Sequence, residues 1–161
     1  MTWFDGLLLL GVAATVAYQM RQEAGRTMLD TVAAVAAAHF SRVIAPTVTV
    51  WLGWKALPGW DSSPVLQALC FALLLAGLLL ASRVLHRQTR WTMDQFDPVF
   101  GLVFALVTAA VVGHSVADLW AGIAVARTGQ VPDYLASSLL GEELRSFHSF
   151  HAAVNAIRRD F

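Results

Sequence analysis

The chain has little charge of either sign and a single cysteine. Charged residues make up 14% of its 161 residues, apolar residues make up 57%, and the mean hydropathy is +0.60. Soluble domains carry about 25% charged residues, so this composition excludes an ordinary soluble domain. Because Cys70 is the only cysteine, neither a disulfide nor a cysteine metal cluster can form within one chain. We therefore expect an integral membrane protein, with the lipid bilayer as its first partner.

Motifs for binding or catalysis are also scarce. Lys and Arg number 11, as do Asp and Glu, so no basic field is available to attract nucleic acid. The sequence has no phosphate loop, nucleophile elbow or zinc-protease motif. We therefore expect neither nucleic-acid binding nor enzymatic activity, and no cofactor.

Four apolar stretches are each long enough to cross a bilayer, which takes roughly 20 residues of helix. They cover residues 3–20, 28–52, 64–82 and 98–126. Asp5 and Arg21 flank the first stretch in the wrong order for a cleaved signal peptide, so it is interpreted as a retained span. The sequence thus predicts an all-α integral membrane protein, with about four transmembrane helices in a domain of residues 1–130.

Residues 131–161 form a less apolar tail that is not expected to span. Its larger apolar side chains recur every three or four residues, together with one histidine, which predicts an amphipathic helix. This face comprises Leu140, Leu144, Phe147, His151 and Val154. Such a face can lie on the membrane surface, dock on a partner or pack against its own bundle, and the sequence leaves these alternatives open.

Basic residues in short loops predict the orientation, because they favour the cytoplasmic side. They are concentrated in the loops after the first and third spans, at Arg21, Arg26, Arg83, Arg87 and Arg90. Five tryptophans are expected to form an aromatic belt at the opposite interface: Trp3, Trp51, Trp54, Trp60 and Trp120. Both patterns predict that the N-terminus and the C-terminus lie on the outer side, the periplasm of a bacterium.

The fourth span carries a row of small residues at intervals of four. They are Gly101, Ala105, Ala109, Gly113, Ala117 and Ala121. Small residues at this spacing let helices approach closely in lipid. We expect this ridge to pack against another helix, within the chain or on another chain.

Charged and imidazole side chains inside spans are costly in lipid and usually face a bundle interior or a partner. The candidates are His39 and Arg42 on the second span and His114 and Asp118 on the fourth. Arg42 can pair with Asp118 to fix the helix register, with both histidines adjacent. Alternatively, the histidines and Asp118 can form a proton or ion path.

Two other histidine pairings are weaker alternatives. His39 and His114 are the pair of intramembrane histidines that could ligate a haem b. His148 and His151 in the tail have a spacing that can suit a metal, but no third ligand lies nearby in the sequence. We expect the tail pair to be surface histidines.

The order of several short motifs resembles the CvpA (colicin V production protein) family of bacterial inner-membrane proteins. Asp5 opens the first span, and Arg21, Arg26 and Leu29 correspond to the turn into the second. Other matching elements are Asp97, Gly101 and Phe104 at the fourth span and Ser137, Ser138, Leu139 and Leu140 at the start of the tail. The chain departs from the family pattern at Gln22, where glycine is common, and at Thr108, where arginine is common.

The resemblance implies a multi-spanning protein linked to colicin export and envelope maintenance, without an assigned reaction. Our leading hypothesis is a non-enzymatic protein of this type, acting through helix contacts with itself or with other membrane proteins. One alternative is an accessory subunit of a large energy-transducing or photosynthetic complex. Another is a channel or transporter subunit with a path near His114 and Asp118.

Overall fold

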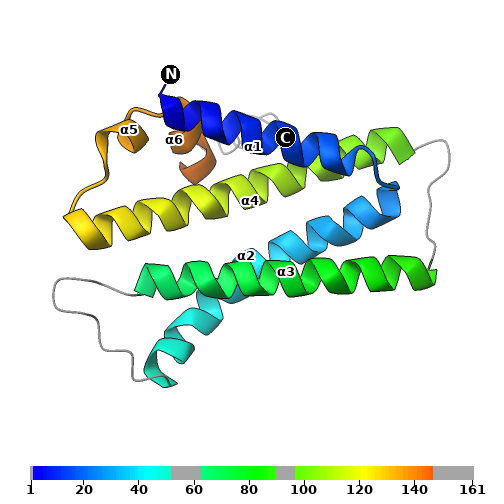
Figure 1. Cartoon of the computed structure of the whole chain (residues 1–161), viewed down its shortest axis with the longest axis horizontal. Coiled ribbons are helices and arrows are strands. Elements are labelled where there is room, and N and C mark those ends of the chain that lie inside the picture. The colour runs from blue at the N-terminus through cyan, green and yellow to red at the C-terminus, as the bar shows by residue number, and fades with distance from the viewer. Residues whose placement is uncertain (1, 52–62, 90–96, 147–161) are drawn as a thin grey trace, which may run out of the picture.

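The structure, a computed structural model, describes residues 2–51, 63–89 and 97–146. These residues form six helices and no strand, as Figure 1 shows. The helices are α1 (Trp3–Gln19), α2 (Ala24–Trp51), α3 (Ser63–Thr89), α4 (Asp97–Thr128), α5 (Asp133–Ala136) and α6 (Leu139–Ser146). The predicted all-α fold is therefore confirmed for the described part of the chain.

Three of the described helices, α2, α3 and α4, are long and apolar enough to cross a membrane. The first predicted span corresponds to α1, a shorter apolar helix of 17 residues. At 1.5 Å per residue α1 measures about 25 Å, against about 30 Å for the hydrocarbon core of a bilayer. The structure thus contains three helices of spanning length and a fourth, shorter apolar helix.

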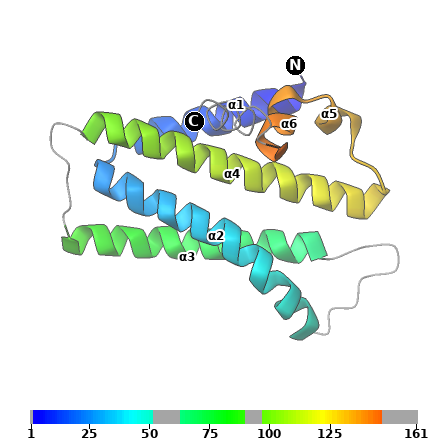
Figure 2. The ribbon, with the colours of Figure 1, turned by 180° about the vertical axis from the view of Figure 1, so that it is seen from behind.

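The long helix α4 lies between α1 and the pair formed by α2 and α3, as both views show (Figures 1 and 2). The end of α1, the start of α2 and the end of α3 meet at one end of the bundle. The start of α1, the end of α2 and the end of α4 lie at the other. Each end of the bundle is therefore formed by residues from several helices.

Local sequence accounts for two helix features. The α1 helix begins with a capping box, in which the Thr2 hydroxyl and the Asp5 carboxylate each accept a backbone N–H of the other residue. Pro46 lies inside α2 and cannot donate to the carbonyl four residues before it, that of Arg42. The last turns of α2 curve away from α3 in Figure 1, as a proline in a helix favours.

The small-residue ridge of α4 faces the rest of the chain. Five of its six residues are buried, and Gly113 is half-buried. A Cβ atom added to Gly113 would lie 3.2 Å from Cδ1 of Leu144 in α6. Ala121 packs in a core cluster with Phe4 and Leu8 of α1. The ridge therefore brings α1 and α6 onto α4 within one chain.

The described part of the tail packs against its own bundle. Leu140 and Leu144 of α6 pack against the core cluster formed by α1, α4 and Leu135 of α5. Of the alternatives for the tail, residues 131–146 thus adopt packing on the bundle. Phe147, His148, His151 and Val154 lie outside the described residues.

We expect enlargement of the ridge to destabilise the bundle. Ala105 has no exposed surface, so Ala105→Leu should reduce the free energy of unfolding by about 2 kcal/mol through overpacking. The measurement is thermal or denaturant unfolding in detergent. Val103 is 49% exposed on the same helix, so Val103→Leu is the matched control and should be nearly neutral. Equal effects of the two substitutions would contradict the packing role of the ridge.

Candidate functional site

A polar cluster in the middle of the bundle joins three helices. Nη2 of Arg42 in α2 lies 3.0 Å from Oδ2 of Asp118 and 3.0 Å from Nε2 of His114, both in α4. Nδ1 of His114 lies 2.6 Å from the carbonyl oxygen of Leu144 in α6. A guanidinium only donates, so Nε2 accepts and Nδ1 donates its proton to Leu144. The cluster therefore holds His114 as one neutral tautomer and fixes α2, α4 and α6 relative to one another.

His39 does not join this cluster, so the expectation that both histidines lie beside the ion pair is wrong for His39. Its side chain is exposed, and its ring lies edge-on to Phe40 with 5.5 Å between centroids. Ala37 and Ser41 are buried, and each is two residues away, about 200° around the helix. His39 thus points away from the packed face of α2, whereas the longer Arg42 side chain reaches α4 from its flank.

The ion pair is only partly shielded. The side chains of Arg42 and Asp118 are 50% and 43% exposed, respectively. The hollow beside them, lined by residues such as Ser41, Gln67 and Ser115, has no room for a water molecule. Within one chain, the cluster is therefore built as a contact between helices rather than around a water-filled space.

A second polar cluster, which the sequence patterns do not predict, attaches the tail to α1. Asp5 is fully buried. Its carboxylate accepts hydrogen bonds from the hydroxyl of Ser138 at 2.5 Å, the backbone N–H of Leu140 at 3.1 Å and that of Thr2 at 2.6 Å. The Ser138 hydroxyl also caps α6 by accepting the N–H of Gly141 at 2.8 Å. One carboxylate thus organises the start of α1 and the start of α6.

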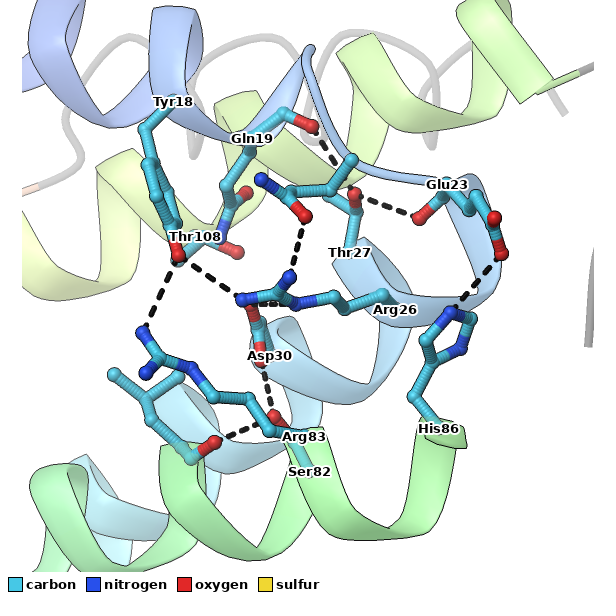
Figure 3. A network of polar contacts seen from close by, with 12 residues as sticks. Tyr18, Gln19, Glu23, Arg26, Thr27, Asp30, Ser82, Arg83, His86 and Thr108 are labelled. Carbon is cyan, nitrogen blue, oxygen red and sulfur yellow. Dashed lines mark hydrogen bonds and ion pairs between the residues drawn. The ribbon is translucent and has the colours of Figure 1, made fainter. Parts of the chain in front are cut away.

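Figure 3 shows a third cluster, at the end of the bundle where α1, α2 and α3 meet. The Tyr18 hydroxyl accepts hydrogen bonds from two guanidinium groups, that of Arg26 at 3.0 Å and that of Arg83 at 3.3 Å. Nε2 of His86 in α3 lies 3.0 Å from a carboxylate oxygen of Glu23. Side chains of three helices therefore meet at the end that carries the basic loops.

The same cluster continues toward the bundle interior. Asp30 of α2 is buried, accepts a short hydrogen bond from the Ser82 hydroxyl of α3 and lies 4.0 Å from Nε of Arg26. At the next residue of α2, the hydroxyl groups of Thr31 and Thr108 are 2.8 Å apart and join α2 to α4. Asp30 lies inside the second apolar stretch, and a lone acid there was the sequence signal for this contact.

Three tryptophans of the expected belt are described, and all three are exposed: Trp3, Trp51 and Trp120. Trp3 begins α1 and Trp51 ends α2, so both lie at the end of the bundle opposite the third cluster. The indole N–H of Trp120 donates to the Tyr134 hydroxyl at 3.0 Å. Trp54 and Trp60 lie outside the described residues.

The described residues do not assemble a metal or haem site. No three His, Cys, Asp or Glu side chains converge on one point within residues 2–51, 63–89 and 97–146. His39 faces outward while His114 is bonded to Arg42 and Leu144, so the two imidazoles are not placed to ligate one haem. Comparison of the chain with family models, with curated proteins and with solved structures finds no match.

The Asp5 contacts predict that its charge holds the tail in place. Asp5→Asn replaces one carboxylate oxygen by an N–H donor that faces other donors, which should lower the unfolding temperature by several degrees and loosen α6. Limited proteolysis after α5 and hydrogen exchange of α6 would measure the release. Asp133→Asn is the control, because the Asp133 side chain is exposed. Unchanged protection of α6 in Asp5→Asn would contradict the role of Asp5.

The ion pair of Arg42 with Asp118 should be coupled but weak. Because polar contacts between transmembrane helices contribute about 0.6 kcal/mol on average, a double-mutant cycle with Arg42→Gln and Asp118→Asn should give a coupling of about 0.5–1 kcal/mol. Unfolding in detergent measures it. A parallel cycle of His39→Gln with Asp118→Asn should show no coupling. A coupling near zero for the first cycle would mean that the pair does not form.

Proposed function

We propose that the chain is a non-enzymatic bacterial inner-membrane protein of the CvpA type, which acts in envelope homeostasis or secretion through helix contacts. Its partners would be copies of itself or other membrane proteins. The observation that carries this proposal is that the polar side chains within the bundle are engaged in contacts between helices. Asp5, Asp30, Asp118 and the Thr31 hydroxyl each bond to another helix or to the tail.

The outer surface of the bundle also supports a role in contacts. In the most apolar 18-residue segments of α2, α3 and α4, only 39%, 17% and 28% of the residues, respectively, are buried inside the chain. Apolar grooves of about 330 Å³ and about 500 Å³ lie between α1 and α4 and between α3 and α4. Grooves of this kind accept lipid chains or side chains of a neighbouring helix.

Two motifs of the CvpA resemblance contact each other in the structure. Asp5, which opens the first span, accepts hydrogen bonds from Ser138 and Leu140, which belong to the motif at the start of the tail. Two motifs whose residues lie 133 positions apart in the sequence thus join the tail to the start of α1. Thr108, at the position where the family often has arginine, instead bonds to Thr31. These contacts support the resemblance at the tail and leave the fourth span different.

The distribution of charge supports the proposed orientation. Arg26 and Arg83 meet on Tyr18 at one end, and exposed Trp3 and Trp51 lie at the other. The positive-inside rule would place the first end in the cytoplasm. The N-terminus would then lie in the periplasm, with the described part of the tail beside it.

Native mass measurement of the full chain, purified from its own membrane in mild detergent, tests the proposal. We expect a discrete homo-oligomer, or an assembly with other membrane proteins. Because α3 is the least buried span, Leu73→Ala with Leu80→Ala should shift the complex toward monomer. Leu10→Ala, on the exposed face of α1, is the control.

The outcomes separate the candidate functions. Co-purification with a fixed set of other subunits of an energy-transducing or photosynthetic complex would instead identify the chain as an accessory subunit. Ion or proton flux through a reconstituted oligomer, lost in Asp118→Asn, would identify a channel or transporter subunit. A monomer that retains only lipid would contradict the proposal.

A further inference from the structure

The third cluster lines an open pocket of about 240 Å³ at the basic end of the bundle. Its lining comes from α1, α2 and α3: Tyr18, Arg26, Arg83, His86 and Arg87. Four of these side chains are visible in Figure 3, where Tyr18 lies between the two labelled arginines. Three guanidinium groups and an imidazole therefore surround one small space.

Neutral groups position two of these arginines without cancelling their charge. Arg26 donates to the Tyr18 hydroxyl and to the side-chain oxygen of Gln22, and Arg83 donates to the same hydroxyl. Two cations that share one neutral acceptor repel each other, and the carboxylate of Asp30, 4.0 Å from Nε of Arg26, supplies only one negative charge. The arrangement therefore favours an anionic occupant.

The carboxylates of this region do not line the pocket. Asp30 is buried on the interior side, where it bonds to Ser82 and lies 4.0 Å from Nε of Arg26. Glu23 is half exposed and contacts His86. Arg87 has no ion pair with any carboxylate of the described residues. Asp30 thus lies beside Arg26 and Glu23 beside His86, whereas Arg83 and Arg87 have no carboxylate partner among the described residues, so the excess positive charge lies on the pocket side.

Two polar atoms of the lining side chains lack hydrogen-bond partners among the described residues. They are Nε of Arg26 and Nδ1 of His86, and both are buried. Buried polar atoms without partners are uncommon and costly in folded proteins. The hydrogen bonding of these two lining side chains is therefore incomplete.

We propose that this pocket binds a phosphate group, that of an anionic phospholipid headgroup at the membrane surface or of a soluble phosphate. Guanidinium groups match phosphate oxygens in geometry and charge. The pocket lies where α1 and α3 end and α2 begins, and Val84 and Leu85 beside Arg83 are exposed apolar residues. A headgroup can thus enter while its acyl chains remain in lipid, as in basic pockets between transmembrane helices.

The test uses the full chain in detergent, titrated with phosphatidylglycerol and, separately, with phosphatidylcholine, and followed by native mass spectrometry. Phosphatidylglycerol should be retained in preference to phosphatidylcholine. Arg83→Gln with Arg87→Gln should weaken its binding by at least roughly tenfold, because two charges near the headgroup are lost. Both side chains are exposed, so the variant should fold. Arg21→Gln is the control for the effect of each single charge, since Arg21 is an exposed arginine at the same end but outside the pocket.

A second variant tests the geometry at constant charge. Tyr18→Phe removes the hydroxyl that both guanidinium groups share, so it should also weaken binding of phosphatidylglycerol. Inorganic phosphate, added as a competitor, identifies the source of the ligand. Displacement of the lipid would show that the phosphate group alone is recognised, and lack of displacement would show that the pocket needs a lipid.

Binding of inorganic phosphate alone, lost in the double variant, would identify a soluble ligand for the same pocket. Equal retention of the two lipids with no effect of inorganic phosphate would overturn the proposal. A loss of binding free energy in Arg21→Gln of half that in the double variant would also overturn it, because Arg21→Gln removes one charge against two and general surface charge would then explain the binding.

Discussion

Hydrogen bonds and ion pairs between side chains of different helices determine how this bundle packs. Lipid supplies little hydrophobic force between helices and few partners for polar groups, so polar side chains in a span must find one another. Helix α2 does so in both directions, through Asp30 with Ser82 of α3 and through Thr31 with Thr108 of α4. Arg42 adds a contact to α4 nearer the other end. The most polar span therefore bonds to both of the other long helices.

The hydropathy of the sequence was enough to predict the helices, but it misplaced several of their ends. The second predicted span began at residue 28, whereas α2 begins at Ala24 and includes Arg26 and Thr27. The third was expected to end at residue 82, but α3 continues to Thr89. Helix hydrogen bonds continue past the apolar region, because charged residues outside the lipid still form helix. These extra turns carry the basic pocket, so hydropathy alone could not reveal it.

The candidate site was predicted in part. A charge in an apolar span needs a partner, and only a few residues had the right depth, which led to Arg42 and Asp118. The same argument failed for His39, because sequence spacing gives the angle between two residues but not which face is packed. Asp5 was noted as the opening of a span, but its partner Ser138 is 133 residues away. No local pattern predicts such a contact without the fold.

The short helix α1 shows how these contacts act together. A helix of about 25 Å is shorter than the hydrocarbon core, and hydrophobic mismatch of this kind leaves its ends at the edge of the lipid. Here both ends have polar partners within the protein. Asp5 bonds to Ser138 at one end, and Tyr18 bonds to Arg26 and Arg83 at the other. Between them, α1 has an apolar groove toward α4 rather than a continuous packed face. Position is thus set at the two ends of α1, and a phosphate group in the basic pocket would strengthen one of them.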